Sequence, residues 1–368
     1  MAVLVVNAGS SSLKLRVLAD DDAVTRSVDI DDWDGGTRVL GHLAGEHRID
    51  AVGHRVVHGG SLFTGPVVVD DDVEAQIESL TSLAPLHQPR ALAGIRATRK
   101  ELSGVPSVAC FDTAFHADLP AAAATYALPG SWRRRWDLRR FGFHGLSHAY
   151  ASRRAAALLD RPLADLRIVT CHLGAGASLC AVSGGRSVDT TMGFTPLEGL
   201  VMATRAGSVD PGLVLWLLGN TDLSVGQVND ALEHESGLLG LSESTGDLQR
   251  LLQSEDAESE LGVSVYVHRL ASLVAAMTVS MGGLDAVTFT GGVGENSSQI
   301  RAMAVERLAH LGLAIDTSFN DAAAGDVDIS SPGSVVRVLV LQSREDLEIA
   351  RLVRSLVTLD QPGAGGDA

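Results

Sequence analysis

The chain has 368 residues, of which 45% are hydrophobic and 20% are charged, a composition that supports a large core and excludes global disorder. Its 29 basic and 45 acidic residues give a formal net charge of −16, which argues against nucleic acid or an anionic membrane as a partner. The length is too great for one simple core and favours two domains.

The sequence carries no clear targeting signal. The first residues, MAVLVVNAG, lack a basic segment and form too short an apolar stretch for a signal peptide. No run approaches the roughly 18 apolar residues of a membrane span. The three cysteines, Cys110, Cys171 and Cys180, are an odd and scattered set, so we expect a reduced, cytoplasmic protein.

The first elements predict a β-hairpin. Residues 2–6 form an apolar strand, and residues 13–18 alternate between apolar and polar side chains. The small residues at 7–12 expose backbone N–H groups and three hydroxyls near Lys14, which suits a bound phosphate, although an ordinary Ser-rich hairpin explains the same pattern. Only two of the 29 basic residues are lysines, so a lysine at this place favours the phosphate interpretation.

A series of strands and helices follows. The pattern predicts strands at residues 52–57 and 105–111, and helices at residues 70–83, 90–102 and 144–159. We interpret the last of these helices as a hinge between two halves of the chain.

The opening pattern returns near residue 170. Residues 167–173 and 179–182 predict two strands around the glycine-rich loop at 174–178, and residues 186–191 follow after a Ser-Gly-Gly turn. Two halves that each begin with strand, donor-rich loop and strand indicate a duplicated α/β architecture.

The rest of the second half alternates between helices and strands. We predict buried helices at 213–218 and 268–281, a strand at 287–290, a glycine-rich turn at 291–296, a helix from 297 or 298, a strand at 335–341, a helix at 345–356 and a disordered tail at 360–368. The turn at 291–296 allows a nucleotide to lie against backbone, but it lacks the GxGxxG spacing of a dinucleotide site.

Three charged residues occupy positions that suit chemistry. Arg55 lies where a strand runs into a Gly-Gly turn, and Arg205 lies in a loop before a helix, with glycines that let a ligand approach. Asp112 directly follows a predicted strand, as catalytic carboxylates often do. The alternatives are surface ion pairs for the two arginines and a helix N-cap for the aspartate.

Other patterns favour structure over chemistry. The pairs His54/His58 and His144/His148 have i,i+4 spacing, but they lack a third ligand and the Glu of an HExxH motif, which argues against zinc. We interpret the arginine cluster within residues 133–140 as a solvated helical face or a local phosphate-side patch.

Nine segments occur in an order that is typical of one family. They are NAGSSSLK (7–14), GHRVVHGG (53–60), APLHQP (84–89), FDTAFH (111–116), RFGFHGLSH (140–148), HLGAGAS (172–178), DTTMGFTPLEG (189–199), TRAGSVDP (204–211) and TGGVGENS (290–297). This series resembles the acetate kinase family from residue 1 to about 355.

The resemblance implies an α/β fold of two duplicated actin-like ATPase domains, related to ribonuclease H, with a cleft between them that closes on a nucleotide, and a homodimer. It implies an N-terminal domain at residues 1–147, with the C-terminal helix at about 347–358 packing on it. A nucleotide-binding and dimerisation domain would span residues 148–346, with a disordered tail at 359–368.

The implied activity is reversible transfer of the γ-phosphoryl group from ATP to acetate, which gives acetyl phosphate and ADP. The resemblance assigns Asn7 and Glu345 to Mg²⁺, with Mn²⁺ as an alternative ion, and Lys14 to the ATP phosphates. It places Arg55 on acetate and on the transferred phosphoryl group. The remaining catalytic positions are Asp112, the active-site carboxylate, and His144 and Arg205, which would stabilise the transition state.

Two further sets follow from the same resemblance. The expected ATP-binding residues, besides Lys14, are His172, Leu173, Gly174, Ala175, Gly176, Asp247, Leu248, Gln249, Gly292, Val293, Gly294, Glu295 and Asn296. The expected apolar pocket for the substrate methyl group consists of Val57, Leu86, Phe143 and Pro196.

Three positions depart from the family pattern. Members usually carry Asn where this chain has Ala175 and Arg where it has Gln249, which puts the affinity for ATP in doubt. The last motif reads QSREDL at residues 342–347, where TNEEL is usual, so Asp346 is an alternative to Glu345 as the metal ligand.

Several alternatives stay open. Propionate competes with acetate, because one methylene in an apolar pocket is worth only about 1–3 kcal/mol. Butyrate fits less well, since Phe143 and Pro196 indicate a small pocket, and pyrophosphate is a minor alternative donor because Gly292 and Val293 leave room for a nucleoside. A nucleotide-binding protein without kinase activity would not require the two arginines. The acidic charge and the 4% aromatic content oppose a nucleic-acid binder.

Overall fold

The computed structural model describes residues 1–9, 12–33, 36 and 38–359. The chain divides into two compact units. Unit 1 comprises Met1–Ala117, Phe143–Tyr150 and the described residues from Arg344 onward, and unit 2 comprises Asp118–Gly142 and Ala151–Ser343. The segment Asp118–Gly142, which the sequence analysis assigns to the N-terminal domain, therefore belongs to unit 2. The tail at 360–368, expected to be disordered, lies outside the described residues.

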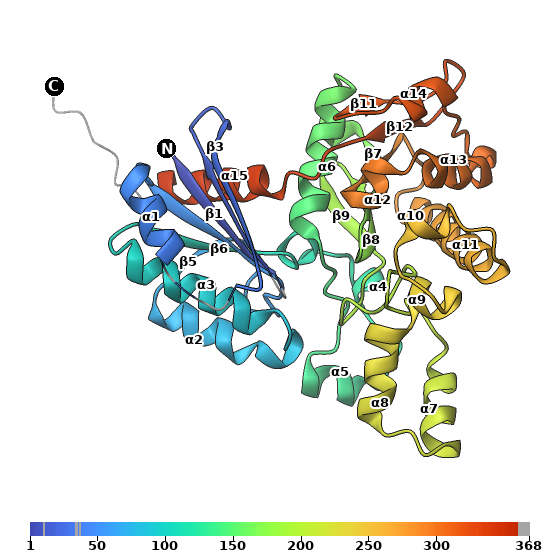
Figure 1. Cartoon of the computed structure of the whole chain (residues 1–368), viewed down its shortest axis with the longest axis horizontal. Coiled ribbons are helices and arrows are strands. Elements are labelled where there is room, and N and C mark those ends of the chain that lie inside the picture. The colour runs from blue at the N-terminus through green and yellow to red at the C-terminus, as the bar shows by residue number, and fades with distance from the viewer. Residues whose placement is uncertain (10–11, 34–35, 37, 360–368) are drawn as a thin grey trace. The chain divides into compact units, whose positions relative to one another are not determined.

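Unit 1 is built on a six-stranded sheet with the strand order β3-β2-β1-β4-β6-β5 (Figure 1). The strands are β1 (Val3–Ala8), β2 (Ser12–Leu18), β3 (Val24–Asp31), β4 (Ala51–Val56), β5 (Val67–Val68) and β6 (Ser107–Phe111). Strands β1, β4 and β6 run parallel, whereas β2, β3 and β5 are antiparallel to their neighbours. The predicted hairpin is confirmed by the antiparallel pairing of β1 with β2.

Unit 2 repeats this plan strand for strand. Its sheet has the order β11-β12-β10-β7-β8-β9. The strands are β7 (Arg167–Leu173), β8 (Ala177–Ser183), β9 (Arg186–Thr190), β10 (Ala286–Thr290), β11 (Val327–Asp328) and β12 (Arg337–Val340). Here β7, β10 and β12 run parallel, and β8, β9 and β11 are antiparallel to their neighbours. The two sheets have identical connectivity, which confirms the predicted duplication.

Helices cover both faces of the first sheet. They are α1 (Arg38–Glu46), α2 (Asp71–Ser79), α3 (Gln88–Glu101), α15 (Glu345–Leu359) and the start of α6 (Gly145–Leu158). Because successive strand residues point to opposite faces, Leu4 and Val6 pack with α1 and α3, whereas Val3 and Val5 pack with α15. The last helix of the chain therefore lies against the first strand (Figure 1).

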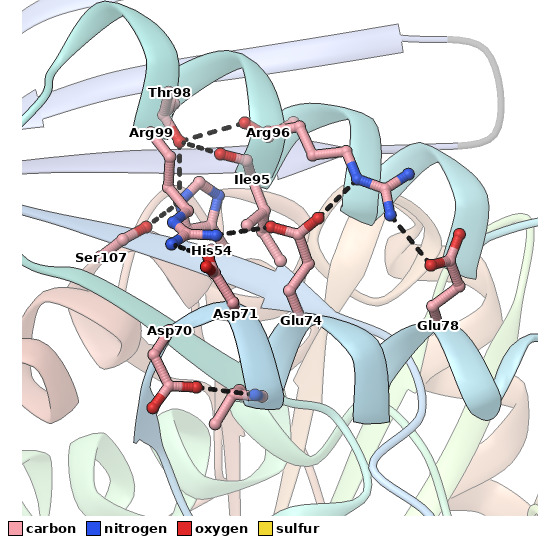
Figure 2. Close-up of polar contacts among 12 residues, drawn as sticks. His54, Asp70, Asp71, Glu74, Glu78, Ile95, Arg96, Thr98, Arg99 and Ser107 are labelled. Carbon is pink, nitrogen blue, oxygen red and sulfur yellow. Dashed lines mark hydrogen bonds and ion pairs between the residues drawn. The ribbon is translucent and has the colours of Figure 1, made fainter.

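Charged side chains join α2 to α3 (Figure 2). Arg96 of α3 pairs with Glu74 at 2.6 Å and with Glu78 at 3.0 Å. Arg99 pairs with Glu74 at 2.7 Å and with Asp71 at 2.8 Å. Each pair is partly exposed and contributes little alone, but the shared Glu74 links them into a network that fixes the two helices side by side.

His54 of β4 is buried beneath this helical layer (Figure 2). Its Nε2 atom hydrogen-bonds Ser107 Oγ at 2.8 Å and Thr98 Oγ1 at 3.1 Å. Burial lowers the pKa of His54 from 6.5 to about 3, so its ring is neutral in the folded protein.

Unit 2 holds most of the short helices. The short helices are α4 (Ala121–Ala124), α5 (Gly130–Trp136), α7 (Pro211–Asn220), α8 (Val225–Asp230), α9 (Gly237–Ser242), α10 (Leu248–Leu251), α12 (Gly291–Asn296), α13 (Ser298–Arg307) and α14 (Thr317–Asp321), with a π-helical turn at Ala231–Glu235, and the long helix is α11 (Ala257–Val279). Two predictions are wrong here. Residues 291–296 form a helix rather than a turn, and α7 has no buried residue although it was expected to be buried.

Helix α11 is long and apolar enough, by length and composition alone, to cross a membrane, which the sequence analysis did not expect. In the structure, Val263, Val267, Leu270 and Val274 recur at intervals of four, three and four residues and are buried within unit 2. This spacing is typical of a core helix that turns one face inward.

Candidate active site

Three parallel strands of unit 1 bring three of the predicted site residues to one edge of the sheet. Asn7 is in β1, Arg55 is in β4, and Asp112 directly follows β6. The carboxyl ends of parallel neighbours lie at the same edge, where α/β sheets commonly bind ligands. The residues two positions earlier in each strand pack against α15, so Asn7, Arg55 and Asp112 share that face.

The Arg55 guanidinium makes the central contacts. Its Nη2 atom donates to Asp112 Oδ2 at 2.7 Å, and its Nε atom lies 3.2 and 3.1 Å from the two carboxylate oxygens. Its Nη1 atom lies 3.5 Å from Oε2 of Glu345, the first residue of α15. Burial disfavours the charged guanidinium, but the two carboxylates outweigh this effect and raise the pKa of Arg55 above its ordinary value. Arg55 is therefore a fixed cation at the sheet edge.

The two alternatives for the metal ligand have different surroundings. Arg344 engages both oxygens of Asp346, through Nε at 2.9 Å and Nη2 at 2.8 Å. Glu345 instead faces Arg55 and keeps 15% of its side chain exposed. A carboxylate and the amide oxygen of Asn7 are oxygen ligands that Mg²⁺ accepts, and few protein ligands suffice for an ion that also binds phosphate. The donor set therefore fits Mg²⁺.

His144 precedes α6 in a left-handed backbone conformation, with a φ of +55°. The next amide, Gly145 N, donates to the backbone oxygen of Asp112 at 2.9 Å, and a side chain at position 145 would collide with that oxygen. His116 Nε2 hydrogen-bonds the backbone oxygen of Phe143 at 3.0 Å. These contacts tie the main chain at His144 to the main chain at Asp112 and hold the strained conformation.

The other predicted residues of unit 1 are less closely linked. Lys14 is exposed on β2, and its register partner in β1 is the predicted metal ligand. Val57 follows β4, and the buried Phe143 ring lies 5.3 Å from the ring of His58. Leu86 is 56% exposed, and the contacts of the described residues do not join it to the other members of the expected methyl pocket.

Two predicted nucleotide-binding segments lie side by side in unit 2. His172 and Leu173 end β7, and the following turn closes when Gly174 N donates to the Gly176 oxygen at 3.0 Å. Thr290 of β10 is in register with His172, so α12 begins beside this turn. Gly291 has a φ of +78°, and a side chain there would lie 2.7 Å from the Leu173 oxygen. Glycine is therefore required for this close approach.

A cavity of about 420 Å³ joins α12 to the third predicted segment. The predicted residues that line it are Asp247, Leu248, Gln249, Gly292, Val293 and Asn296. The residues that the sequence analysis missed are Leu252, Gln253, Ser297, Ser298 and Gln299. The first two of these lie one helical turn after Leu248 and Gln249, so the i,i+4 spacing of a helix was the signal that could have identified them.

Gly294 and Glu295, also predicted to bind ATP, do not line this cavity. Gly294 is buried, and Glu295 Oε1 accepts hydrogen bonds from Gly291 N and Ser343 N, both at 2.9 Å. Behind them the buried Arg301 donates through Nη1 to the backbone oxygens of Gly294 and Glu295, at 2.9 and 2.8 Å. These residues support the main chain of α12. No sequence pattern pointed to Arg301, because a buried arginine resembles an exposed one in sequence.

Arg205 lies in the loop before α7, and its side chain is 24% exposed. Its Nε atom lies 3.2 Å from Glu233 Oε2, and its Nη1 atom donates to the backbone oxygen of Pro196 at 3.4 Å. The structure thus brings together Arg205 and Pro196, which the sequence analysis assigned to the transition state and to the methyl pocket. Each unit carries a partly exposed arginine that a carboxylate orients, an arrangement suited to binding anionic oxygens.

Comparison with known proteins identifies the family. A family model described as the Acetokinase family matches residues 39–351. The chain belongs to the acetokinase family. Among curated acetokinases, the acetate kinase of Synechococcus sp. (strain JA-2-3B'a(2-13)) is 48% identical over 328 residues, which cover 88% of this chain and 80% of that protein.

Solved acetokinase structures share the fold. The crystal structure of Porphyromonas gingivalis acetate kinase matches with a TM-score of 0.90 and 33% identity, covering 97% of this chain and 99% of that chain. A propionate kinase from Francisella tularensis subsp. tularensis SCHU S4 matches with a TM-score of 0.89 and 33% identity, covering 96% and 99%. The predicted α/β fold of two duplicated actin-like domains is therefore confirmed.

Proposed function

We propose that this acetokinase transfers the γ-phosphoryl group of ATP to acetate, reversibly and with Mg²⁺, and gives acetyl phosphate and ADP. The observation that carries this proposal is the cluster of Arg55, Asp112 and Glu345 at the carboxyl edge of a sheet, in a chain of this family. The relatives from Synechococcus sp. and P. gingivalis are named acetate kinases.

The chemistry requires charge neutralisation rather than proton transfer. Acetate is already ionised at pH 7, so its attack on phosphorus needs no general base. The barrier arises because a carboxylate must approach anionic phosphate oxygens in a loose, in-line transition state. Arg55, Arg205 and His144 would supply hydrogen-bond donors and positive charge to those oxygens. Substitution of either arginine should therefore lower turnover more than the affinity for ATP.

Asp112 is best suited to orient Arg55. Its two oxygens accept from Nε and Nη2 of the guanidinium, which fixes the plane of the fork and directs Nη1 toward Glu345. Because the reaction moves no proton, we assign Asp112 this positioning function and assign Arg55 the binding of acetate and of the transferred phosphoryl group.

Asn7 and Glu345 would hold Mg²⁺, with Mn²⁺ as the alternative ion. When bound, the ion would neutralise phosphate charge. Glu345 is preferred over Asp346 because Arg344 already engages both oxygens of the aspartate. Lys14 would contact the phosphates as a compact, mobile charge.

We assign the nucleoside of ATP to the cavity of unit 2, together with the turn at 172–176. About 420 Å³ lies within the range of small-molecule sites, and the lining combines apolar side chains with amides. Gln249 lines the cavity at a position where the family pattern usually has arginine, and Ala175 is exposed in the turn at a position where that pattern usually has asparagine. Loss of these polar groups should weaken ATP binding relative to such family members.

Propionate is the second candidate substrate. The F. tularensis structure, which is named a propionate kinase, matches this chain at the same identity as the P. gingivalis acetate kinase. The residues of the expected methyl pocket, Val57, Leu86, Phe143 and Pro196, are all apolar, so they offer no polar group that would reject the further methylene of propionate. Such a group changes binding by only about 1–3 kcal/mol, so we expect modest discrimination.

An endpoint hydroxamate assay tests the proposal. Purified protein, ATP, Mg²⁺ and hydroxylamine are combined with acetate, propionate, butyrate or no acid, and acyl phosphate is detected as the coloured iron complex of its hydroxamate. Signal that requires both acetate and Mg²⁺ is the expected result, and the ratio across acids measures the discrimination of the pocket. No signal with any acid, with either ATP or pyrophosphate as donor, would favour a nucleotide-binding protein without kinase activity.

We also propose a cytoplasmic homodimer that has neither nucleic acid nor a membrane as partner. The three cysteines are buried and form no disulfide, which fits a reducing compartment. Apolar side chains on α7, including Leu215 at 70% and Trp216 at 57% exposure, supply a surface that a second copy would cover.

A further inference from the structure

Arg205 lies on a loop that is attached to a π-helical turn, Ala231–Glu235. The backbone N–H of Ala206 donates to the Leu232 oxygen at 3.1 Å, and Thr204 Oγ1 donates to the Glu233 oxygen at 2.9 Å. π-Helical turns are rare and occur often at functional sites. Here two successive carbonyl groups of the turn accept hydrogen bonds from the residues on either side of Arg205.

The segment after the turn holds the loop from a second side. Leu238 N donates to the Met202 oxygen, and Leu239 N donates to the Ala203 oxygen, both at 2.9 Å. Gly237 has a φ of +63°, and a side chain there would lie 2.7 Å from the backbone oxygen of Arg205. The main chain at Arg205 is therefore fixed before its side chain makes any contact.

Two contacts then hold the Arg205 guanidinium from different sides. Glu233 Oε2 lies 3.2 Å from Nε, and the Pro196 oxygen accepts from Nη1 at 3.4 Å. Neither contact uses Nη2. Both side chains of the ion pair are partly buried, at 24% exposure for the arginine and 19% for the glutamate, so the pair is less screened by solvent than a surface pair.

We propose that Glu233 is a positioning residue, which fixes the rotamer of Arg205 through Nε so that the guanidinium is pre-oriented to donate to the transferring phosphoryl group. The inference rests on the proposed function, in which Arg205 stabilises the transition state. A carboxylate beside that arginine also offsets part of its positive charge. Glu233 must therefore act by orientation, because its charge alone would oppose the stabilisation of an anionic transition state.

A double-mutant cycle tests this proposal. Turnover and the KM values for ATP and acetate are measured for Arg205→Ala, Glu233→Ala, Glu233→Gln and the double variant Arg205→Ala/Glu233→Ala. We expect Arg205→Ala to lower kcat by at least roughly 10²-fold and Glu233→Ala to lower it by about tenfold, with the KM for ATP unchanged. Glu233→Gln keeps an acceptor for Nε and should retain wild-type kcat. The double variant should be no slower than Arg205→Ala.

Glu235→Ala is the matched control, since it removes an exposed carboxylate from the same turn and should leave kcat unchanged. The thermal unfolding midpoint of each variant identifies any general loss of structure. Any of three results would overturn the proposal. They are kcat losses that multiply in the double variant, equal kcat losses in Glu233→Gln and Glu233→Ala, and wild-type kcat in Glu233→Ala. Wild-type kcat in Arg205→Ala would instead refute the role assigned to Arg205 in the proposed function.

Discussion

Two buried histidines of unit 1, His54 and His116, take no direct part in the proposed chemistry. Burial lowers the pKa of His54 to about 3 and that of His116 to about 4, although the hydrogen bond to Phe143 partly offsets the second shift. Both rings are therefore neutral near pH 7. The neutral His54 ring hydrogen-bonds the hydroxyl groups of Ser107 and Thr98. Their contribution to stability depends on pH.

We expect the free energy of unfolding to fall as the pH is lowered from about 6.5 toward 4. In that window the unfolded chain binds protons at His54 and His116 that the folded protein does not bind, and each group contributes about 1.4 kcal/mol per pH unit. Above 6.5 the contribution is constant. Urea unfolding across this range should give a smaller pH slope for His54→Gln than for wild type. Equal slopes for the two proteins would contradict a neutral His54.

At the scale of elements, the contact of β4 with α15 determines where Glu345 lies. Gly53 is the point of closest approach, because a side chain there would collide with Ile349 and would lie 2.7 Å from Val353 Cγ2. Glu345 begins the same helix and reaches Arg55, two residues after Gly53 on the same face. A single glycine therefore couples the packing of the core to the position of the expected metal ligand.

Gly53→Ala should lower the free energy of unfolding by about 1–3 kcal/mol, since overpacking forces neighbouring side chains or the helix to move. Gly45→Ala in α1 is the matched control, because a methyl group at that position would have no neighbour within 4 Å and alanine favours helix, so it should be neutral or slightly stabilising. Denaturant unfolding monitored by circular dichroism measures both. Equal stability of Gly53→Ala and wild type would refute the close packing of α15.

The sequence predicted best those elements whose apolar and polar residues alternate or whose ends are marked by turn residues. Residues 167–173 match β7, because a short, mostly apolar run that ends at a glycine-rich turn is typical of a buried strand. Strand β3 was missed because most of its residues are exposed and polar. Helix α12 was expected to be a turn because it contains three glycines. Hydrogen bonds hold it in place, since Arg301 donates to its backbone and the Glu295 carboxylate accepts from its first amide. Such contacts override local helix propensity.

The residues of the candidate site also fall into those that the sequence could identify and those that it could not. Arg55, Asp112 and Arg205 stand in motifs at strand ends or in glycine-rich loops, so they could be named from sequence, and strand parity places the first two on one face. Glu233 and Arg301 could not, since neither lies in a recognisable motif and each acts through contacts between segments distant in sequence. Residues that support a site are set by the fold, whereas residues that perform chemistry often carry a local signature.

For the whole molecule, the duplicated topology of the two sheets explains the division of labour that we propose. Each unit has three parallel strands whose carboxyl ends meet at one edge. In unit 1 that edge carries charged side chains, and in unit 2 it carries glycines and the cavity beside α12. The same architecture thus supports the proposed anion site in unit 1 and the proposed nucleoside site in unit 2.

The apolar surface of α7 bears on assembly. The helix was expected to be buried because PGLVLWLLG is apolar on every side, yet Leu213, Leu215 and Trp216 are 49%, 70% and 57% exposed. We expect the chain to form a homodimer that covers this helix, so Leu215→Glu/Trp216→Glu should shift the mass measured by multi-angle light scattering from dimer to monomer. Val335→Glu, at an 82% exposed position elsewhere, should leave the dimer intact. A monomeric wild type, or a dimer unaffected by the α7 substitutions, would exclude this surface as the interface.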